Sequence, residues 1–261
     1  MAQRIQVTLW YLFLLGALFN ASRVLAAYPL ITDDTGTQVR GGFQTEFNGM
    51  LGHDKEGRTQ ERTHESVTTV SYGLADSTDL VLGVPYRISK VRDEAGALKS
   101  RGISDVSLEI KWRFFQIDGL SLAFKPGLTF PTGNHKKGAG TGRVTYNAFL
   151  IITQEIPPWS FHANLGYGRN ANRLTERKDV WHASIAAELE IFQGLRLVGN
   201  VGAERNRDKT STVDPAFVIG GFVYSLSQNL DVACGIQFGI TKSETDYAIR
   251  PGLVYRFNFQ E

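Results

Sequence analysis

Residues 106–114 read Val-Ser-Leu-Glu-Ile-Lys-Trp-Arg-Phe, and this strict alternation decides the fold. A β-strand points successive side chains to opposite faces, so the stretch has one apolar face and one polar, largely charged face. Residues 80–88, 120–130, 181–191 and 247–259 repeat the pattern, with apolar residues at nearly every second position. The chain is therefore predicted to consist of amphipathic strands.

Twelve such segments follow one another along the chain. Most are about 10 to 14 residues long, which matches or exceeds the roughly 9 to 11 residues that a tilted strand needs to cross a bilayer. Strands of soluble proteins are shorter, at about 5 or 6 residues. We therefore predict an all-β protein, an antiparallel transmembrane β-barrel of about 12 strands. The segments begin near Gln38, Thr63, Asp79, Ser104, Leu120, Arg143, Trp159, Asp179, Leu195, Val213, Leu230 and Thr245.

The connections alternate between tight turns and long polar loops. The tight ones are residues 76–78, 117–119, 157–158, 192–194 and 227–229. The others are residues 53–61, 91–101, 131–141, 170–178 and 205–212, with 241–244 as a shorter exception. If the first strand starts in the periplasm, every long loop lies outside the cell, as in bacterial outer-membrane barrels.

The charged faces are predicted to line an aqueous lumen, because a charge at the bilayer middle costs roughly 2–4 kcal/mol. Such side chains either tune which solutes pass or form an ion-pair network that fills and stiffens the barrel. Three-residue turns at 117–119 and 192–194 would set Phe114 opposite Leu122, Lys125 opposite Lys111, and Glu190 opposite Arg196. The predicted lumen-lining residues are Arg87, Glu109, Lys111, Arg113, Lys125, Arg143, Glu188, Glu190, Arg196 and Arg250.

Aromatic residues gather near the strand ends and predict two girdles at the headgroup level. Those expected on the periplasmic side are Tyr72, Trp112, Phe114, Trp159, Phe161, Tyr255 and Phe257. Those expected on the outer side are Tyr86, Phe130, Tyr146, Tyr167, Trp181 and Tyr247. The alternation of Tyr255, Phe257 and Phe259 resembles the C-terminal signature that the barrel-assembly machinery recognises. A soluble sandwich with packed apolar faces is the alternative fold.

The first 27 residues have the features of a targeting segment. Arg4 precedes an apolar run over residues 7–19, and small residues follow up to Ala26 and Ala27. This pattern predicts a Sec signal peptide over residues 1–27, with an uncleaved membrane anchor as the alternative. Residues 28–37 would then form a periplasmic N-terminal segment, and 38–259 the barrel in the outer membrane.

Composition narrows the function. A net charge of +2 argues against a nucleic-acid partner, and the single cysteine, Cys234, excludes an internal disulfide. No cofactor or metal is predicted, because the carboxylates of Asp33 and Asp34 lack further ligands. This pair is expected to be a polar turn, a cation site or a cap below the lumen.

The start of the mature chain carries a family resemblance. Residues 28–37 read Tyr-Pro-Leu-Ile-Thr-Asp-Asp-Thr-Gly-Thr, and Gly-Phe-Gln-Thr-Glu follows at 42–46. These residues, with 74–80 and 128–133, resemble the outer-membrane transporter family associated with the meta-pathway of phenol degradation. The resemblance implies a barrel that transports small, hydrophobic or aromatic compounds and has no established catalytic residues.

We therefore expect a channel or transporter for small molecules, not an enzyme, with outer-membrane lipid, an unknown permeant and the assembly machinery as partners. One alternative is a lipid hydrolase. His64 and Ser66 share a strand face, but no orienting group and no Gly-x-Ser-x-Gly motif is present. The other alternative is a structural or adhesive barrel that binds partners through the charged loops 54–58 and 173–178.

Overall fold

The computed structural model describes residues 28–257. The predicted signal peptide and Phe259 lie outside the described residues. Within the described range no helix is long and apolar enough to cross a bilayer.

Antiparallel strands make up most of the described residues, and one short 3₁₀ helix, η2 (His135–Lys137), lies in the connection between β6 and β7. The strands are β1 (Phe43–Glu56), β2 (Thr59–Ala75), β3 (Thr78–Asp93), β4 (Gly96–Ile103), β5 (Val106–Ile117), β6 (Leu120–Phe130), β7 (Thr145–Ile156), β8 (Trp159–Arg169), β9 (Asp179–Phe192), β10 (Leu195–Glu204), β11 (Ala216–Ser225), β12 (Leu230–Gly239) and β13 (Tyr247–Phe257).

The sheet closes on itself as a barrel with twelve strand positions around its circumference. Consecutive strands pair with one another, except β4 with β5, and β1 pairs with β13 to close the cylinder. Strands β4 and β5 both pair with β3, β4 along its loop-side half and β5 along its turn-side half. They are separated only by Ser104 and Asp105, so together they occupy one of the twelve strand positions as a single interrupted strand. The predicted barrel of about 12 strands is confirmed, and the sandwich alternative is wrong.

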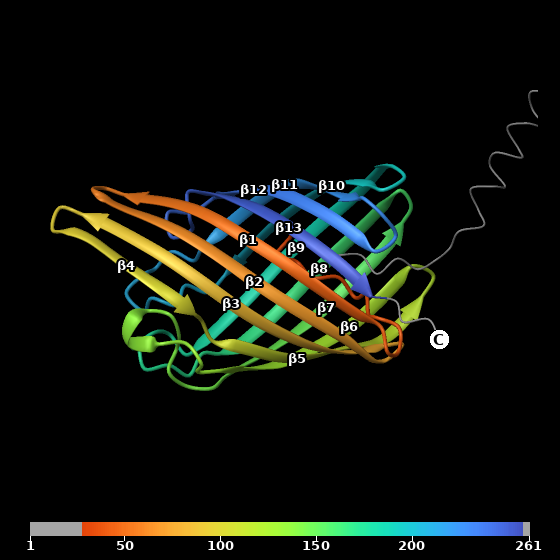
Figure 1. Ribbon diagram of the computed structural model, residues 1–261, viewed down its shortest axis with the longest axis horizontal. Helices are drawn as coiled ribbons and strands as arrows, with labels where there is room; N and C mark the ends of the chain where they lie inside the picture. Colours follow the sequence, from red (N-terminus) through yellow and green to blue (C-terminus); the bar gives the residue numbers. More distant parts are fainter. Residues whose placement is uncertain (1–27, 258–261) are drawn as a thin grey trace, which may run out of the picture.

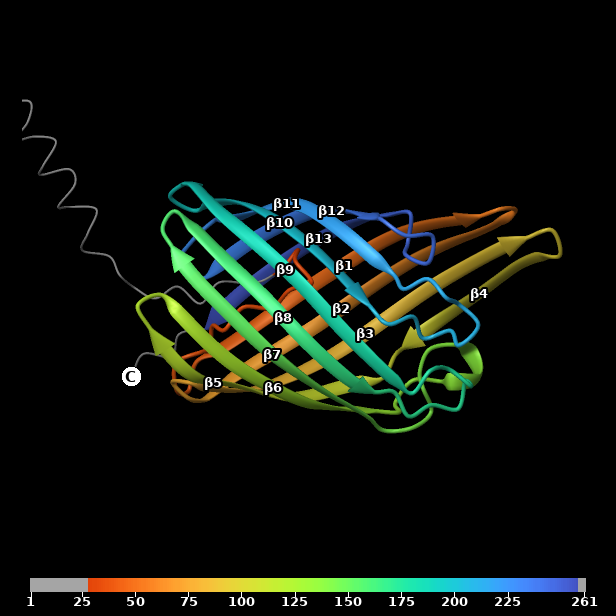
Figure 2. The ribbon, with the colours of Figure 1, turned by 180° about the vertical axis from the view of Figure 1, so that it is seen from behind.

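The two ends of the barrel differ. The hairpins β1–β2 and β3–β4 project beyond the other connections at one end, which we call the loop end (Figures 1 and 2). The tight turns and the C-terminal end of the described chain lie at the opposite end, the turn end. Residues 53–61 and 91–101, predicted as loops, instead continue these two hairpins. Strand β1 begins at Phe43, five residues after the predicted start at Gln38.

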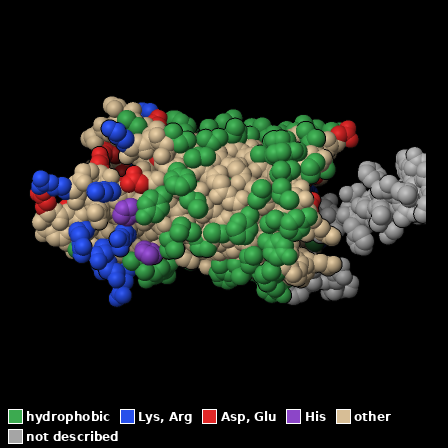
Figure 3. Space-filling view, turned by 90° about the horizontal axis from the view of Figure 1, so that it is seen from above, with side chains coloured by type: hydrophobic (Ala, Val, Ile, Leu, Met, Phe, Trp, Pro, Cys, Tyr) green, Lys and Arg blue, Asp and Glu red, His purple; other side chains and the backbone are tan. Residues whose placement is uncertain are grey.

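Apolar side chains cover the outside of the cylinder. Figure 3 shows them as a band, with Lys and Arg gathered at the loop end beyond it. All the aromatic residues assigned to the two girdles are exposed on this outer surface. Three girdle pairs at the turn end are in ring contact: Trp112 with Phe114 at 5.6 Å, Trp159 with Phe161 at 5.9 Å and Tyr255 with Phe257 at 4.5 Å between centroids. The odd and even positions of each strand thus separate an apolar exterior from a polar interior.

One predicted register is wrong in detail. Ile117 pairs with Leu120, so Asp118 and Gly119 form a two-residue turn, both with positive φ, as type I′ turns require. A bulge after Arg113 then absorbs one residue and sets Phe115, not Phe114, opposite Leu122. Below the bulge the predicted register returns.

That return places the two central lysines together. Trp112 pairs with Phe124 and Glu109 with Gly127, which sets Lys111 beside Lys125 as predicted. In the β9–β10 hairpin, Glu190 pairs with Arg196 as predicted, again next to a bulge.

Candidate functional site

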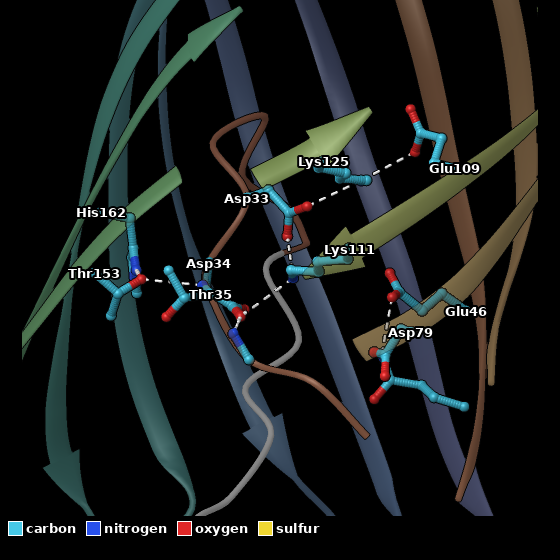
Figure 4. Close-up of polar contacts among 12 residues, drawn as sticks. Asp33, Asp34, Thr35, Glu46, Asp79, Glu109, Lys111, Lys125, Thr153 and His162 are labelled. Atoms are coloured by element: carbon cyan, nitrogen blue, oxygen red, sulfur yellow. Dashed lines mark hydrogen bonds and ion pairs between the residues drawn. The ribbon is translucent and has the colours of Figure 1, made fainter. Parts of the chain in front are cut away.

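The N-terminal residues 28–38, here called the inner segment, lie inside the barrel. We expected residues 28–37 in the periplasm, ahead of the first strand, yet most of their side chains are buried against the barrel wall. Figure 4 shows the segment crossing the lumen, with Asp33 and Asp34 pointing toward side chains of the surrounding strands. The interior is therefore narrowed by the chain's own N-terminal residues.

The start of the inner segment packs closely against glycines of the barrel wall, here called the glycine cradle. A Cβ added at Gly235 of β12 would lie 2.9 Å from a ring carbon of Pro29. Arg250 of β13 donates to the Pro29 carbonyl at 3.0 Å, and its guanidinium lies 5.3 Å from the Tyr28 ring centroid. Burial raises the pKa of Tyr28 to about 12. Its hydroxyl therefore stays protonated and donates to the carbonyl of Gly49.

The middle of the segment is held by hydrogen bonds to three strands. Asn200 Oδ1 accepts from the backbone amides of Ile31 and Thr32, at 2.8 and 3.2 Å. The Thr32 hydroxyl donates to Ser184 at 2.7 Å, and the Thr35 amide donates to Thr153 at 3.1 Å. Buried amides need such partners, since an unpaired polar group costs about 1–3 kcal/mol. The wall is thus complementary to the segment's backbone.

Charges join the segment to the opposite wall. Asp33 Oδ1 lies 2.9 Å from Lys111 Nζ, and Oδ2 lies 3.0 Å from Lys125 Nζ (Figure 4). Each lysine has a second partner: Asp34 lies 3.5 Å from Lys111, and Glu109 lies 3.1 Å from Lys125. Burial opposes ionisation of Asp33, but the two ammonium groups outweigh it and hold its pKa below the usual carboxyl range. Asp33 is therefore an anionic bridge between the segment and strands β5 and β6.

Further contacts between charged and polar side chains continue around the wall toward the turn end. Glu188 lies 3.6 Å from His162 Nε2 and 3.4 Å from Arg196 Nη1. Arg196 also lies 3.7 Å from Asp231, which pairs with Arg256 at 2.8 Å. The five side chains come from β8, β9, β10, β12 and β13. They link these strands to one another on the turn-end side of the inner segment.

The structure separates the ten predicted lumen residues into groups. Glu109, Lys111, Lys125, Glu188, Arg196 and Arg250 lie inside, in the contacts given above. Arg87 faces inward from β3 and lies 3.5 Å from Glu61, and Arg113 donates to the Asp76 carbonyl near the turn end at 3.1 Å. Glu190 is exposed near the turn-end rim. Arg143 is a correction, since it is exposed in the loop before β7 and belongs to no strand.

The inner segment leaves open space in the barrel on its loop side. A cavity of about 440 Å³ lies on the loop side, here called the vestibule. Phe149 packs over Gly166 and meets His182 edge-on at 5.8 Å, beside Val180 in the same wall. Polar groups also line the vestibule, among them Glu65, Arg87, Asn147 and Glu204.

A second cavity of about 200 Å³, here called the side gap, lies beside the inner segment against β1, β2, β3, β5 and β6. Its charged lining consists of four carboxylates and two ammonium groups, from Asp33, Asp34, Glu46, Asp79, Lys111 and Lys125.

One arrangement in the lumen resembles hydrolase geometry. His182 Nε2 lies 2.9 Å from the Ser184 hydroxyl, and His182 Nδ1 lies 3.9 Å from Glu204. A nucleophilic serine must face its substrate, but Ser184 is buried and accepts a hydrogen bond from Thr32. The inner segment thus covers the serine. His64 and Ser66 are exposed on the outward face of β2.

Within residues 28–257 no three His, Cys, Asp or Glu side chains are grouped as metal ligands. Asp33 and Asp34 face lysines instead.

Sequence reasoning missed the inner segment, Asn200, Asp231 and the glycine cradle. One signal was available: Lys111 and Lys125 were predicted opposite each other, with only Glu109 nearby. Two buried ammonium groups need more than one carboxylate, and Asp33 and Asp34, interpreted as a polar turn, a cation site or a cap below the lumen, were available as further partners.

Comparisons with known proteins place this geometry in context. Residues 32–257 match the model of a family described as "Putative MetA-pathway of phenol degradation". No curated protein matches the sequence. An outer membrane channel from Pseudomonas putida F1 superposes with a TM-score of 0.66 at 12% identity, over 86% of this chain and 98% of that one.

Two further solved structures are similar. The KdgM porin gives a TM-score of 0.54 at 10% identity, over 82% of this chain and 99% of that one. The β domain of the Bordetella autotransporter BrkA gives 0.53 at 11% identity, over 82% and 99%. At these identities the likeness concerns the fold, that of outer-membrane β-barrels.

Proposed function

This chain belongs to the family described as "Putative MetA-pathway of phenol degradation", and from that membership we propose that it is an outer-membrane channel for small molecules. The resemblance seen in its N-terminal residues is thereby confirmed. The observation that carries the proposal is the vestibule of about 440 Å³ inside the barrel. An apolar exterior around such an interior suits a protein that gives solutes a path through a bilayer.

The vestibule supports small aromatic compounds as permeants. Phe149 and Val180 supply an apolar wall, while Arg87 and Asn147 supply polar groups beside it. The Nε of Arg87 and the Oδ1 of Asn147 are buried without a protein partner in the described chain. An aromatic ring can pack on Phe149 while a hydroxyl substituent reaches such polar atoms. A cavity of about 150 Å³ already holds benzene, so the vestibule has room for a substituted ring.

The inner segment sets the size of what passes. It crosses the lumen, and the side gap of about 200 Å³ is the space beside it. Solutes of a few heavy atoms fit such a space, whereas oligosaccharides or peptides do not. We infer a narrow channel for single small molecules, with the inner segment as its constriction.

Solute passage through the purified protein in liposomes tests the proposal. Proteoliposomes should swell in isotonic solutions of small polar solutes that cross protein-free bilayers slowly, such as arabinose or the aromatic amino acid phenylalanine, faster than protein-free liposomes, and should not swell in a trisaccharide. Phe149→Ala should slow an aromatic solute more than an aliphatic solute of equal size, whereas Phe130→Ala, on the outer surface, should affect neither. Equal, protein-independent swelling in every solute would refute the channel.

The route to the membrane is part of the same proposal. The chain would reach the outer membrane through the Sec pathway and be inserted by the barrel-assembly machinery. An absence of any permeation would instead favour a structural or adhesive barrel. Turnover of phospholipid or lipopolysaccharide acyl chains that is lost in His64→Ala would favour a hydrolase.

A further inference from the structure

The outer faces of the two projecting hairpins carry basic side chains without acidic ones between them. We call Lys55, Arg62, Lys90, Arg92, Lys99 and Arg101 the basic face; all six are exposed. The neighbouring positions on β2 point inward and are acidic: Glu61 contacts Arg87 and Ser89 inside the barrel, and Glu65 lines the vestibule. Strand alternation thus places acids inside and bases outside in the same hairpins.

The basic side chains are direct neighbours across the strands. Arg62 of β2 pairs with Lys90 of β3, and Lys90 pairs with Lys99 of β4. Cβ atoms of directly paired residues are roughly 5 Å apart, and like charges in such positions destabilise a sheet. Three cations in one cross-strand row therefore repel one another unless an anion lies beside them.

That anion is not supplied by the described chain. None of the ion pairs within residues 28–257 involves a member of the basic face. Elsewhere at the loop end an outward-facing cation is neutralised. Arg169 at the end of β8 lies 2.6 Å from Asp179 of β9.

The basic face begins where the apolar band ends. On β3, Tyr86 and Ile88 precede Lys90 on the same outward face, and on β4, Arg101 is followed by the outward Ile103. Figure 3 shows the same transition, with Lys and Arg side chains next to the edge of the hydrophobic band. Side chains at this height meet lipid headgroups, not the hydrocarbon core.

We propose that the basic face binds the phosphate groups of the phosphorylated glycolipid of the outer leaflet. Arginine forms paired hydrogen bonds with phosphate and lysine adds a compact charge, so Arg62, Lys90 and Lys99 suit one anionic headgroup. The face lies on the side of the barrel and is continuous with the membrane-facing surface, which favours a lipid over a soluble acidic partner. The lipid site is independent of solute passage through the lumen.

Binding of labelled lipid A to the detergent-solubilised mature protein tests the site. We expect saturable binding of bisphosphorylated lipid A and at least tenfold weaker binding, about 1.4 kcal/mol, of the same lipid without phosphates. The triple variant Arg62→Gln, Lys90→Gln, Lys99→Gln should lose affinity for the phosphorylated lipid to a similar extent. The control Arg169→Gln, whose charge is already paired, should stay within twofold of the wild type.

Two outcomes would overturn the proposal. One is unchanged affinity in the triple variant, and the other is displacement of the lipid by inorganic phosphate at equal concentration, which would indicate a general anion site. If the triple variant does not fold, the single variant Lys99→Gln replaces it, with an expected loss of severalfold. Wild-type binding should also weaken from about 0.1 M to about 1 M salt, and insensitivity to salt would likewise contradict the site.

Discussion

Replacing Asp33 by asparagine removes the carboxylate through which the inner segment contacts β5 and β6. Its two oxygens accept hydrogen bonds from the ammonium groups of Lys111 and Lys125, at 2.9 and 3.0 Å. A hydrogen bond to a charged group contributes about 1.5–3 kcal/mol. The lysines keep Asp34 and Glu109 as partners, and the asparagine carbonyl still accepts one hydrogen bond. We therefore expect the seated segment to be destabilised by about 2 kcal/mol, roughly 30-fold in its ratio to the released form.

Single-channel recording in planar bilayers measures this change. Asp33→Asn should spend roughly 30-fold more time in a high-conductance state than the wild type, and a variant without residues 28–37 should stay in that state. Asp118→Asn is the matched control, since Asp118 lies in a turn at the same end with positive φ, which asparagine tolerates. If the deletion opens the channel but Asp33→Asn behaves like Asp118→Asn, the ion pairs do not hold the segment.

Three further results are expected. Because the two lysines hold the pKa of Asp33 below the usual carboxyl range, the stabilisation that its ion pairs give to the seated segment is complete above the ordinary carboxyl pKa of about 4 and is lost as the pH falls through the lower folded value. The difference between Asp33→Asn and the wild type in time spent in the high-conductance state should therefore be the same at pH 7 and pH 5, and a smaller difference at pH 5 would contradict the ion-pair anchor. The side gap has four carboxylates and two ammonium groups, so reversal potentials should show cation preference, reduced in Glu46→Gln; anion preference in the wild type would refute this. Gly235→Val should displace Pro29 and raise conductance, whereas Gly220→Val, whose Cβ would meet no atom within 4 Å, should not; equal conductance of the two variants would argue against the cradle.

Much of the barrel could be predicted because its two faces meet different environments, which select apolar residues on one face and polar residues on the other. Lipid outside and a polar interior impose a period of two, which is visible in the sequence itself. Strands β6, β8, β9, β10 and β12 accordingly begin at the predicted residues. The bulge after Arg113 could not be predicted this way, because an extra residue in one strand changes the pairing and leaves the composition of both faces almost unchanged.

The inner segment was unpredictable for a different reason. It has no periodicity, and its partners lie far away in the sequence, as with Asp33 and Lys111, which are 78 residues apart. Local patterns carry no information on such contacts. Arg143 was misplaced for the same kind of reason: the predicted strand began near it, but β7 starts only at Thr145, so the alternation did not apply to it.

The glycine cradle also has a consequence for the order of assembly. Pro29, near the beginning of the described chain, rests on Gly235 of β12 and bonds to Arg250 of β13, 221 residues later. The last strands are synthesised and inserted long after the first residues. The surface that binds Pro29 therefore does not exist until the barrel is almost complete. Long-range contacts of this kind form late. Protection of Tyr28 from added protease would therefore mark the moment at which the first and last strands have joined.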